Sequence, residues 1–359
     1  MLSSATDLGH RVAIVGCGII GRTHADTVAA HPEASVVALV DSIPAGRAAL
    51  AARLAAAGHP EPRQYDDLTS ALAAGDVDLV AICTPSGTHA ALAEEALAEK
   101  KHVVVEKPLD VDLPRARKLG AAAAAAATGG LVSSVISQHR FDPGSVLVAR
   151  TIAEGGFGAL TSAVATVAWW RSDEYYGSAA WRGTWALDGG GALMNQGVHT
   201  VDLLLWFLGR PVTVQAQIAR TTHHGIEVED TAVATLTFGN GAVATLHATT
   251  AAFGAGGTRI SVHGTEGGAE IENDRLRTFH HHGSTETDVP ALTEPSGHEA
   301  QYADIFRAIA TGEQPGVTIQ HALEALATVR AVYIASTLQH PVRLDEVLDG
   351  VYDDLPIQV

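Results

Sequence analysis

The chain has 359 residues, of which 47% are hydrophobic and 18% are charged, so it is long enough for two domains and too apolar to be disordered. Its 40 acidic residues outnumber its 23 basic residues, and the formal charge of −17 argues against nucleic acid and anionic membranes as partners. Cys17 and Cys83 are the only cysteines, which indicates a reducing compartment without disulfides. We find neither a cleavable signal nor an apolar stretch of membrane-spanning length, and we therefore expect a cytoplasmic protein.

The first motif has the pattern strand, glycine turn, helix. An apolar run at residues 11–15 is followed by glycines at the spacing GxGxxG. In such a turn the first glycine makes the bend, the second lets the backbone approach a pyrophosphate, and the third lets the helix pack closely. The helix N-terminus then offers free N–H groups to the phosphates. The expected cofactor contacts of this turn are Gly16, Gly18, Ile19, Ile20 and Gly21.

The second predicted strand, residues 35–40, ends at Asp41. A carboxylate at this place accepts hydrogen bonds from a ribose diol and repels the 2′-phosphate of NADP, so we expect NAD as the cofactor. Arg47, six residues further on, keeps NADP as the alternative, because its guanidinium can reach a phosphate if the loop folds back. An ordinary strand-end turn for Asp41 and a solvated helix charge for Arg47 are the structural alternatives.

Strands and helices continue to alternate up to residue 140. Strands are expected at 76–82, 102–105 and 131–137, and helices at 45–57, 90–100 and 113–128. This alternation predicts a doubly wound parallel sheet, an α/β Rossmann domain of residues 1–140, with ligands at the carboxyl ends of its strands. Further candidate cofactor contacts follow these ends: Thr84, Pro85, His89, Glu106 and Lys107.

The pattern changes in residues 141–359, for which we expect an α+β domain with substrate-binding and oligomerisation roles. After a helix at 145–154, strands are expected at 159–170, 212–219, 231–238 and 242–250, the last two joined by a hairpin turn at 239–241. Strands without helices between them predict an open, mostly antiparallel sheet. The chain ends with helices at 300–310 and 319–337 and a strand at 342–344, and these helices can pack back on the first domain.

Three glycines, residues 189–191, lead into a predicted helix that carries Asn195, His199 and Asp202. The spacing of the apolar residues places these three side chains on the opposite, polar face. Polar groups at i−4 and i+3 can orient and tune a histidine, which makes His199 a candidate catalytic residue. The alternative is a helix with a solvated polar face.

A polar and aromatic insertion precedes this helix. Aromatic rings beside polar groups suit a carbohydrate, so Tyr176, Trp181 and Arg182 are candidate substrate contacts, with an ordinary packed loop as the alternative. Arg140, at a strand end, fits a substrate contact and a structural helix cap equally well.

The histidine runs 223–224 and 280–282 are expected in solvated loops. Adjacent histidines in a strand point to opposite faces, and no cysteine or carboxylate spacing completes a metal site, so we expect no metal.

The motifs Gly16-Cys-Gly-Ile-Ile-Gly21, Thr84-Pro85 with His89, and Glu106-Lys107-Pro108 resemble those of the Gfo/Idh/MocA oxidoreductase family, which includes inositol and glucose–fructose oxidoreductases. The resemblance covers almost the whole chain, because this family keeps its catalytic histidine in the stretch that contains His199. It implies that Lys107 points at the reacting carbon beside the nicotinamide and that a cis peptide bond precedes Pro108. It also implies a homodimer or homotetramer formed through the open sheet.

Together these features predict a nicotinamide-dependent oxidoreductase that transfers hydride between NAD(H) and a hydroxyl or carbonyl carbon of a sugar, polyol or sugar derivative. His199 would remove the hydroxyl proton and Lys107 would stabilise the developing negative charge. Where part of the family has an aspartate, this chain has Asn195, so either Asn195 or Asp202 is expected to assist His199. The alternatives are an NADP-dependent carbonyl reductase, an NAD-dependent glycoside hydrolase of the same family, and a silent nucleotide sensor, against which the presence of both Lys107 and His199 argues.

Overall fold

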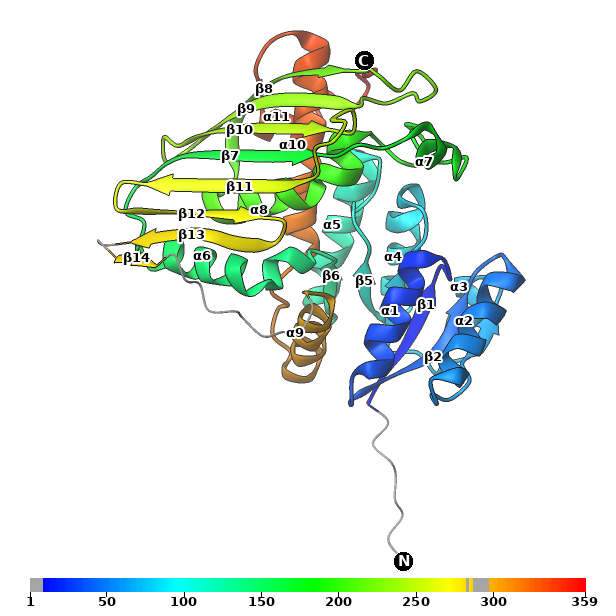
Figure 1. Ribbon diagram of the computed structural model, residues 1–359. Coiled ribbons are helices and arrows are strands. Elements are labelled where there is room, and N and C mark those ends of the chain that lie inside the picture. Colours follow the sequence, from blue (N-terminus) through cyan, green and yellow to red (C-terminus); the bar gives the residue numbers. More distant parts are fainter. Residues whose placement is uncertain (1–8, 282–283, 287–296) are drawn as a thin grey trace, which may run out of the picture. The chain divides into compact units, whose positions relative to one another are not determined.

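The computed structural model describes residues 9–281, 284–286 and 297–359, and the chain divides into two compact units (Figure 1). The first unit comprises Met1–Leu109, Lys118–Ile136 and His298–Ile319, and the second comprises Asp110–Arg117, Ser137–Gly297 and Gln320–Val359. No helix among the described residues is both long enough and apolar enough to cross a membrane.

A six-stranded sheet in the order β3-β2-β1-β4-β5-β6 forms the centre of the first unit. All of its strand pairs are parallel, which confirms the predicted doubly wound sheet. Its central strands are buried on both faces, and for this reason their sequences are continuous apolar runs. The strands are β1 (His10–Val15), β2 (Ala34–Val40), β3 (Arg63–Tyr65), β4 (Leu79–Ile82), β5 (His102–Val105) and β6 (Ser133–Val135).

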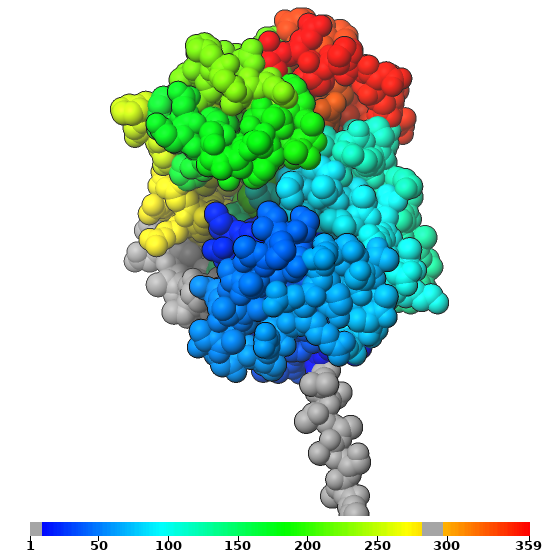
Figure 2. All heavy atoms as spheres, turned by 90° about the vertical axis from the view of Figure 1, so that its right-hand side faces the viewer, coloured from blue at the N-terminus to red at the C-terminus, as the bar shows by residue number. Residues whose placement is uncertain are grey.

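Helices pack on this sheet, and most of them follow the strands in the expected alternation. They are α1 (Ile19–Ala30), α2 (Pro44–Ala56), α3 (Leu68–Ala73), the short η1 (Ser86–Thr88), α4 (His89–Ala98) and α5 (Leu113–Ala127). The outer surface of the first half of the unit, β1 to α3, is drawn in blue in Figure 2. Helix α9 (Gly297–Thr311) comes from far along the chain, and its Tyr302, Ile305 and Phe306 belong to the buried core of this unit.

The second unit contains a nine-stranded sheet in the order β14-β13-β12-β11-β7-β10-β9-β8-β15. Only the pair of β7 and β10 is parallel, so the predicted open, mostly antiparallel sheet is confirmed. The strands are β7 (Leu160–Ala168), β8 (Pro211–Ala219), β9 (Thr231–Phe238), β10 (Val243–Thr249), β11 (Gly257–Gly264), β12 (Gly267–Glu272), β13 (Arg275–His281), β14 (Ser284–Glu286) and β15 (Val342–Arg343).

Helices of the second unit cover one face of this sheet, as Figure 1 shows for α6, α8 and α10. The opposite face exposes Val164, Val233 and Val243, and its use as an oligomer surface stays a prediction. The helices and short turns of this unit are η2 (Gln138–Phe141), α6 (Pro143–Ala153), α7 (Asp173–Gly177), η3 (Ala192–Gly197), α8 (Val198–Leu208), α10 (Ile319–Leu338) and α11 (Leu344–Leu348).

The structure confirms the solvated loop expected for His224 and corrects the expectation for the other described histidines of the two runs. His223 is buried, with Nδ1 3.3 Å from an oxygen of Asp230 and Nε2 2.7 Å from the carbonyl of Arg171. His280 and His281 belong to strand β13, where pairing with β12 draws them into the sheet, while His282 lies outside the described residues.

Candidate active site

The glycine turn between β1 and α1 contains glycines of two kinds. Gly16 has a φ of +95°, and a Cβ on Gly21 would lie 1.9 Å from the carbonyl oxygen of Gly16, so these two are fixed by backbone packing. A Cβ on Gly18 would meet nothing within 4 Å, although Gly18 is the N-cap of α1. Among the described residues no side chain caps this helix and no acidic residue lies in its first turn, so the N–H groups of that turn have no side-chain acceptor there. An anionic pyrophosphate fits this cradle.

The residues next to Gly18 have different surroundings. Ile19, the first residue of α1, is 82% exposed, whereas Ile20 packs against the core of the unit. A large apolar side chain exposed beside the free helix end suits contact with a bound cofactor.

Asp41 follows the end of β2, and the backbone holds its carboxylate in place. Its Oδ2 accepts a hydrogen bond from the N–H of Cys17 at 2.8 Å, and its Oδ1 accepts one from the N–H of Ile43 at 2.8 Å. Arg47 is buried, donates to the backbone carbonyl of Asp41 and forms an ion pair with Asp66 at 2.6 Å. The guanidinium therefore supports the turn at Asp41, which favours recognition of a ribose diol over a 2′-phosphate.

The turn at Lys107 follows the end of β5. The peptide bond between Lys107 and Pro108 is cis, as predicted. His89 is 1% exposed and bridges two strand ends, with Nδ1 2.8 Å from the carbonyl of Pro108 and Nε2 2.8 Å from that of Thr84. Thr84 is further held by a hydrogen bond between its hydroxyl and that of Thr88 at 2.7 Å. His89 thus holds the loop of Thr84 and Pro85 to the turn at Lys107, and its burial suits this role better than direct contact with a ligand.

Glu106 also holds the turn at Lys107 in place. Its Oε1 lies 2.8 Å from Nε2 of His24, and its Oε2 accepts a hydrogen bond from the N–H of Lys107 at 3.0 Å. Nδ1 of His24 lies 2.6 Å from the hydroxyl of Tyr302. Burial opposes the charge on Glu106, but the hydrogen bond and positive charge of His24 prevail and lower its pKa to about 2. The pKa of His24 is raised well above its ordinary value, again against the effect of burial. A buried ion pair therefore fixes the backbone of Lys107.

Sequence reasoning missed His24 and Tyr302. The available signal for His24 was its place on the face of α1 that also carries Gly21, Ala25 and Val28, all of which are buried. A histidine on a buried face requires polar partners.

In the second unit, residues 192–197 form a π-helix, not the α-helix that the spacing predicts. Glu229 holds its start: the carboxylate accepts hydrogen bonds from the N–H of Gly191 at 2.8 Å, the N–H of Leu193 at 2.9 Å and the hydroxyl of Tyr333 at 3.0 Å. Burial nevertheless raises the pKa of Glu229 to about 7. A Cβ on Gly191 would lie 1.7 Å from the carbonyl oxygen of Glu229, so this contact requires glycine. Neither Glu229 nor Tyr333 was predicted as part of the site.

Asp202 does not lie on a polar helix face, which corrects the prediction. Helix α8 is buried around most of its circumference, and Asp202 is only 4% exposed. A buried charge needs a partner, and Arg140 supplies it with two hydrogen bonds of 2.7 Å. The Arg140 guanidinium also lies 5.5 Å from the ring centre of Trp206. These contacts give Arg140 a structural role in a buried ion pair, which differs from the helix cap that was the structural alternative, and its contact with a substrate stays a prediction.

Asn195 and His199 lie on either side of the junction between the π-helix and α8, and both are half-buried. Asn195 donates to Oδ1 of Asp188 at 2.5 Å and accepts a hydrogen bond from Gln196 at 3.1 Å. The ring of His139 meets the ring of His199 edge-on, with a centroid distance of 5.0 Å. Within this unit, His139 is thus an aromatic neighbour of His199 that the sequence did not indicate.

The predicted substrate contacts separate into two groups. Arg182 lies between the rings of Trp181 and Tyr175, 4.5 Å from each ring centre, and donates to the Tyr175 hydroxyl at 2.8 Å. That hydroxyl also accepts a hydrogen bond from Gln196 at 3.2 Å, which links the insertion to the residue after Asn195. Tyr176 instead binds Thr250 through its hydroxyl at 2.8 Å, and burial raises its pKa to about 12.

Comparison with known proteins identifies both parts of the chain. Residues 10–133 match the family model of an oxidoreductase family with an NAD-binding Rossmann fold, and residues 146–270 match the GFO/IDH/MocA C-terminal domain. Inositol 2-dehydrogenase 2 of Paenarthrobacter aurescens is 29% identical over 335 residues, which are 90% of this chain and 94% of that protein. Levoglucosan dehydrogenase of Pseudarthrobacter phenanthrenivorans is 26% identical over 291 residues, 74% of each chain.

Among solved structures, the WlbA dehydrogenase of Bordetella pertussis, in complex with NADH and UDP-GlcNAcA, superposes with a TM-score of 0.81. The two proteins are 30% identical, and the match covers 93% of this chain and 98% of that one. The chain therefore belongs to the GFO/IDH/MocA family of NAD-binding oxidoreductases.

Proposed function

We propose that the protein is an NAD-dependent dehydrogenase that oxidises a hydroxyl group of a sugar or polyol. The observation that carries this proposal is the N-terminus of α1 at Gly18, which has no side-chain cap among the described residues, together with the Asp41 carboxylate, which the N–H of Cys17 holds in place. The substrate class is supported by relatives that are named for inositol and levoglucosan and by a related structure that contains UDP-GlcNAcA.

The first-turn N–H groups of α1 would bind the pyrophosphate of NAD, and Asp41 would bind its adenosine ribose. When bound, NAD supplies the acceptor for a hydride. The ion pair of Arg47 with Asp66 supports NAD over NADP, because a guanidinium that is already paired has less to gain from a phosphate.

His199 would take the proton of the substrate hydroxyl as general base, while the carbon-bound hydrogen leaves as hydride. Lys107 would donate a hydrogen bond to the same oxygen and stabilise its developing negative charge. The anchors of this turn at Glu106 and His89 support this role, because a catalytic ammonium must be held in position.

The proposal is tested by following NADH absorbance with inositols, free aldoses and nucleotide sugars, each with NAD and with NADP. With the best substrate, His199→Ala and Lys107→Ala should each lower turnover by about 10²–10⁴-fold. NADH binding, measured by fluorescence titration, should stay unchanged. His224→Ala and Lys118→Ala serve as controls, because both side chains are exposed.

Unchanged turnover in both His199→Ala and Lys107→Ala would contradict the catalytic assignment. Tighter binding of NADPH than of NADH would contradict the cofactor assignment and show that Arg47 can leave Asp66. Turnover of a glycoside without accumulation of NADH would instead indicate the hydrolase of the same family.

A further inference from the structure

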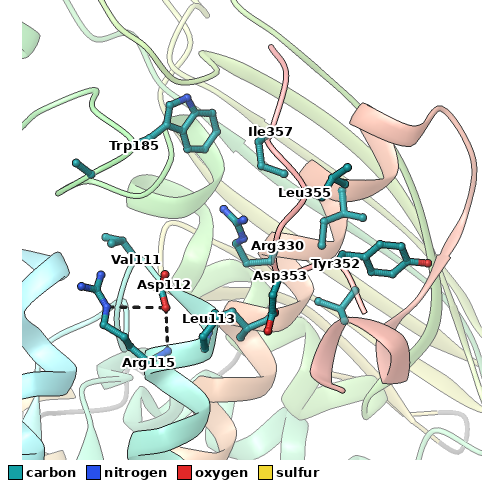
Figure 3. Close-up of a pocket in the computed structure, with 14 residues that line it drawn as sticks. Val111, Asp112, Leu113, Arg115, Trp185, Arg330, Tyr352, Asp353, Leu355 and Ile357 are labelled. Carbon is teal, nitrogen blue, oxygen red and sulfur yellow. Dashed lines mark hydrogen bonds and ion pairs between the residues drawn. The ribbon is translucent and has the colours of Figure 1, made fainter. Parts of the chain in front are cut away.

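A recess in the second unit contains an arginine, Arg330, that forms no ion pair with any residue that the structure describes. The cavity has a volume of about 330 Å³, and Figure 3 shows Arg330 in its middle, between Trp185 and Asp353. Ile334, Leu355 and Ile357 also line it. We infer that this recess binds a small carboxylate with an apolar body, and that the Arg330 guanidinium holds the carboxylate.

The other charged groups that line the recess already have partners. Asp112 accepts a hydrogen bond from the backbone N–H of Arg115 at 2.8 Å and lies 3.9 Å from its guanidinium, and Asp353 forms an ion pair with Arg117. Among the described residues, Arg330 has neither a hydrogen-bond partner nor an ion-pair partner. Its charge is therefore the one that a ligand can neutralise.

The charge of Arg330 also lies in a partly desolvated place. Burial lowers the pKa of Arg330, although Tyr333, Asp112 and Asp353 act in the opposite direction. A desolvated charge without a partner costs free energy, and an anion with two oxygens recovers it through a pair of charge-assisted hydrogen bonds. A carboxylate presents this geometry to a guanidinium.

The side chains that line the recess indicate that the part of the ligand beyond its carboxylate is apolar. Ile334 lies one helical turn after Arg330 on α10, and Leu355 and Ile357 come from the C-terminal segment. The Trp185 ring is held edge-on against Tyr333, with a centroid distance of 5.5 Å, and its backbone N–H binds Glu227. Aliphatic walls and an indole favour an aliphatic or aromatic body. The carboxylates of Asp112 and Asp353 disfavour a dianion such as phosphate.

The test is calorimetric titration of the full-length protein with benzoate, benzyl alcohol and inorganic phosphate. We expect one benzoate to bind per chain, at least about tenfold more tightly than either benzyl alcohol or phosphate. Arg330→Gln should weaken benzoate binding by about tenfold or more without lowering the melting temperature. The guanidinium forms no hydrogen bond or ion pair with the described residues, and burial opposes its charge more than Tyr333, Asp112 and Asp353 favour it. Arg343→Gln is the matched control, because Arg343 is exposed and lies 3.6 Å from Asp345.

Equal affinities for benzoate and benzyl alcohol would overturn the inference, as would unchanged benzoate binding in a folded Arg330→Gln protein. The comparison of benzoate with benzyl alcohol uses the wild type, so it decides the question even if the variant fails to fold. Competition between benzoate and NADH would place the anion at the N-terminus of α1 and would also overturn the inference. Because no substrate is present, the outcome is independent of the proposed dehydrogenase activity.

Discussion

Replacing Glu229 with glutamine should remove a pH dependence of stability that this buried carboxyl group imposes on the second unit. Burial raises its pKa from the ordinary value of 4.5 to about 7, although hydrogen bonds from Leu193, Gly191 and Tyr333 oppose the rise. The native state therefore keeps the proton at pH values at which the unfolded chain has lost it. The resulting stabilisation is present in full below the unfolded pKa and is lost as the pH rises through about 7. A pKa rise from 4.5 to about 7 corresponds to about 3 kcal/mol.

The assay is urea unfolding of wild type and Glu229→Gln at several values between about pH 5 and pH 8. Titration of all other groups is common to both proteins, so the difference between their free energies of unfolding isolates residue 229. As the pH rises over this range, the wild type should lose about 3 kcal/mol of stability relative to Glu229→Gln. Tyr333→Phe is the control: it removes a hydrogen bond that opposes the pKa rise, so the loss of stability should occur at higher pH. Parallel curves for wild type and Glu229→Gln would refute the reasoning.

Three further substitutions test separate parts of the structure. Gly18→Ala should change the free energy of unfolding by less than about 0.5 kcal/mol, because the added Cβ would meet no protein atom within 4 Å. The same Cβ would occupy the space where the pyrophosphate is expected, so the variant should bind NADH more weakly in a fluorescence titration. Gly21→Ala should destabilise the protein by more than about 2 kcal/mol, because its Cβ would collide with the carbonyl of Gly16; equal melting temperatures for the two variants would contradict this distinction. Asp202→Asn leaves the Arg140 guanidinium buried without its anion. The free energy of unfolding in urea should therefore fall by about 3–5 kcal/mol. A loss below about 1 kcal/mol would show that solvent reaches the Arg140 charge.

The fold of the first unit could be predicted because its signals are local. Buried parallel strands such as β4 and β5 are continuous apolar runs, and the glycine turn at Gly16 marks the entry to α1 directly. Strands β11, β12 and β13 gave no such signal. Glycines and charged side chains interrupt their alternation, so their pairing depends on neighbouring strands that the sequence does not place.

The same distinction applies to the site. The turn at Lys107 could be predicted from its motif, but its anchor, His24, stands 82 residues before Glu106. Asp202 was expected to serve a residue on its own helix, yet its partner Arg140 lies 62 residues away. A helical period of 3.6 also assumes an uninterrupted α-helix, and the π-helix before His199 breaks that assumption. Contacts between distant segments follow from packing, which no local spacing encodes.

Helix α9 has a practical consequence for dissecting the protein. A fragment cut at residue 140 would contain all six strands of the first unit but would lack Tyr302 and Phe306. The imidazole of His10, which stacks on Phe306 at 4.6 Å, would face water, and His24 would lose the hydroxyl that binds its Nδ1. Shuffling of dinucleotide-binding halves between relatives should therefore transfer residues 298–319 together with the N-terminal part, since the two segments complete one core.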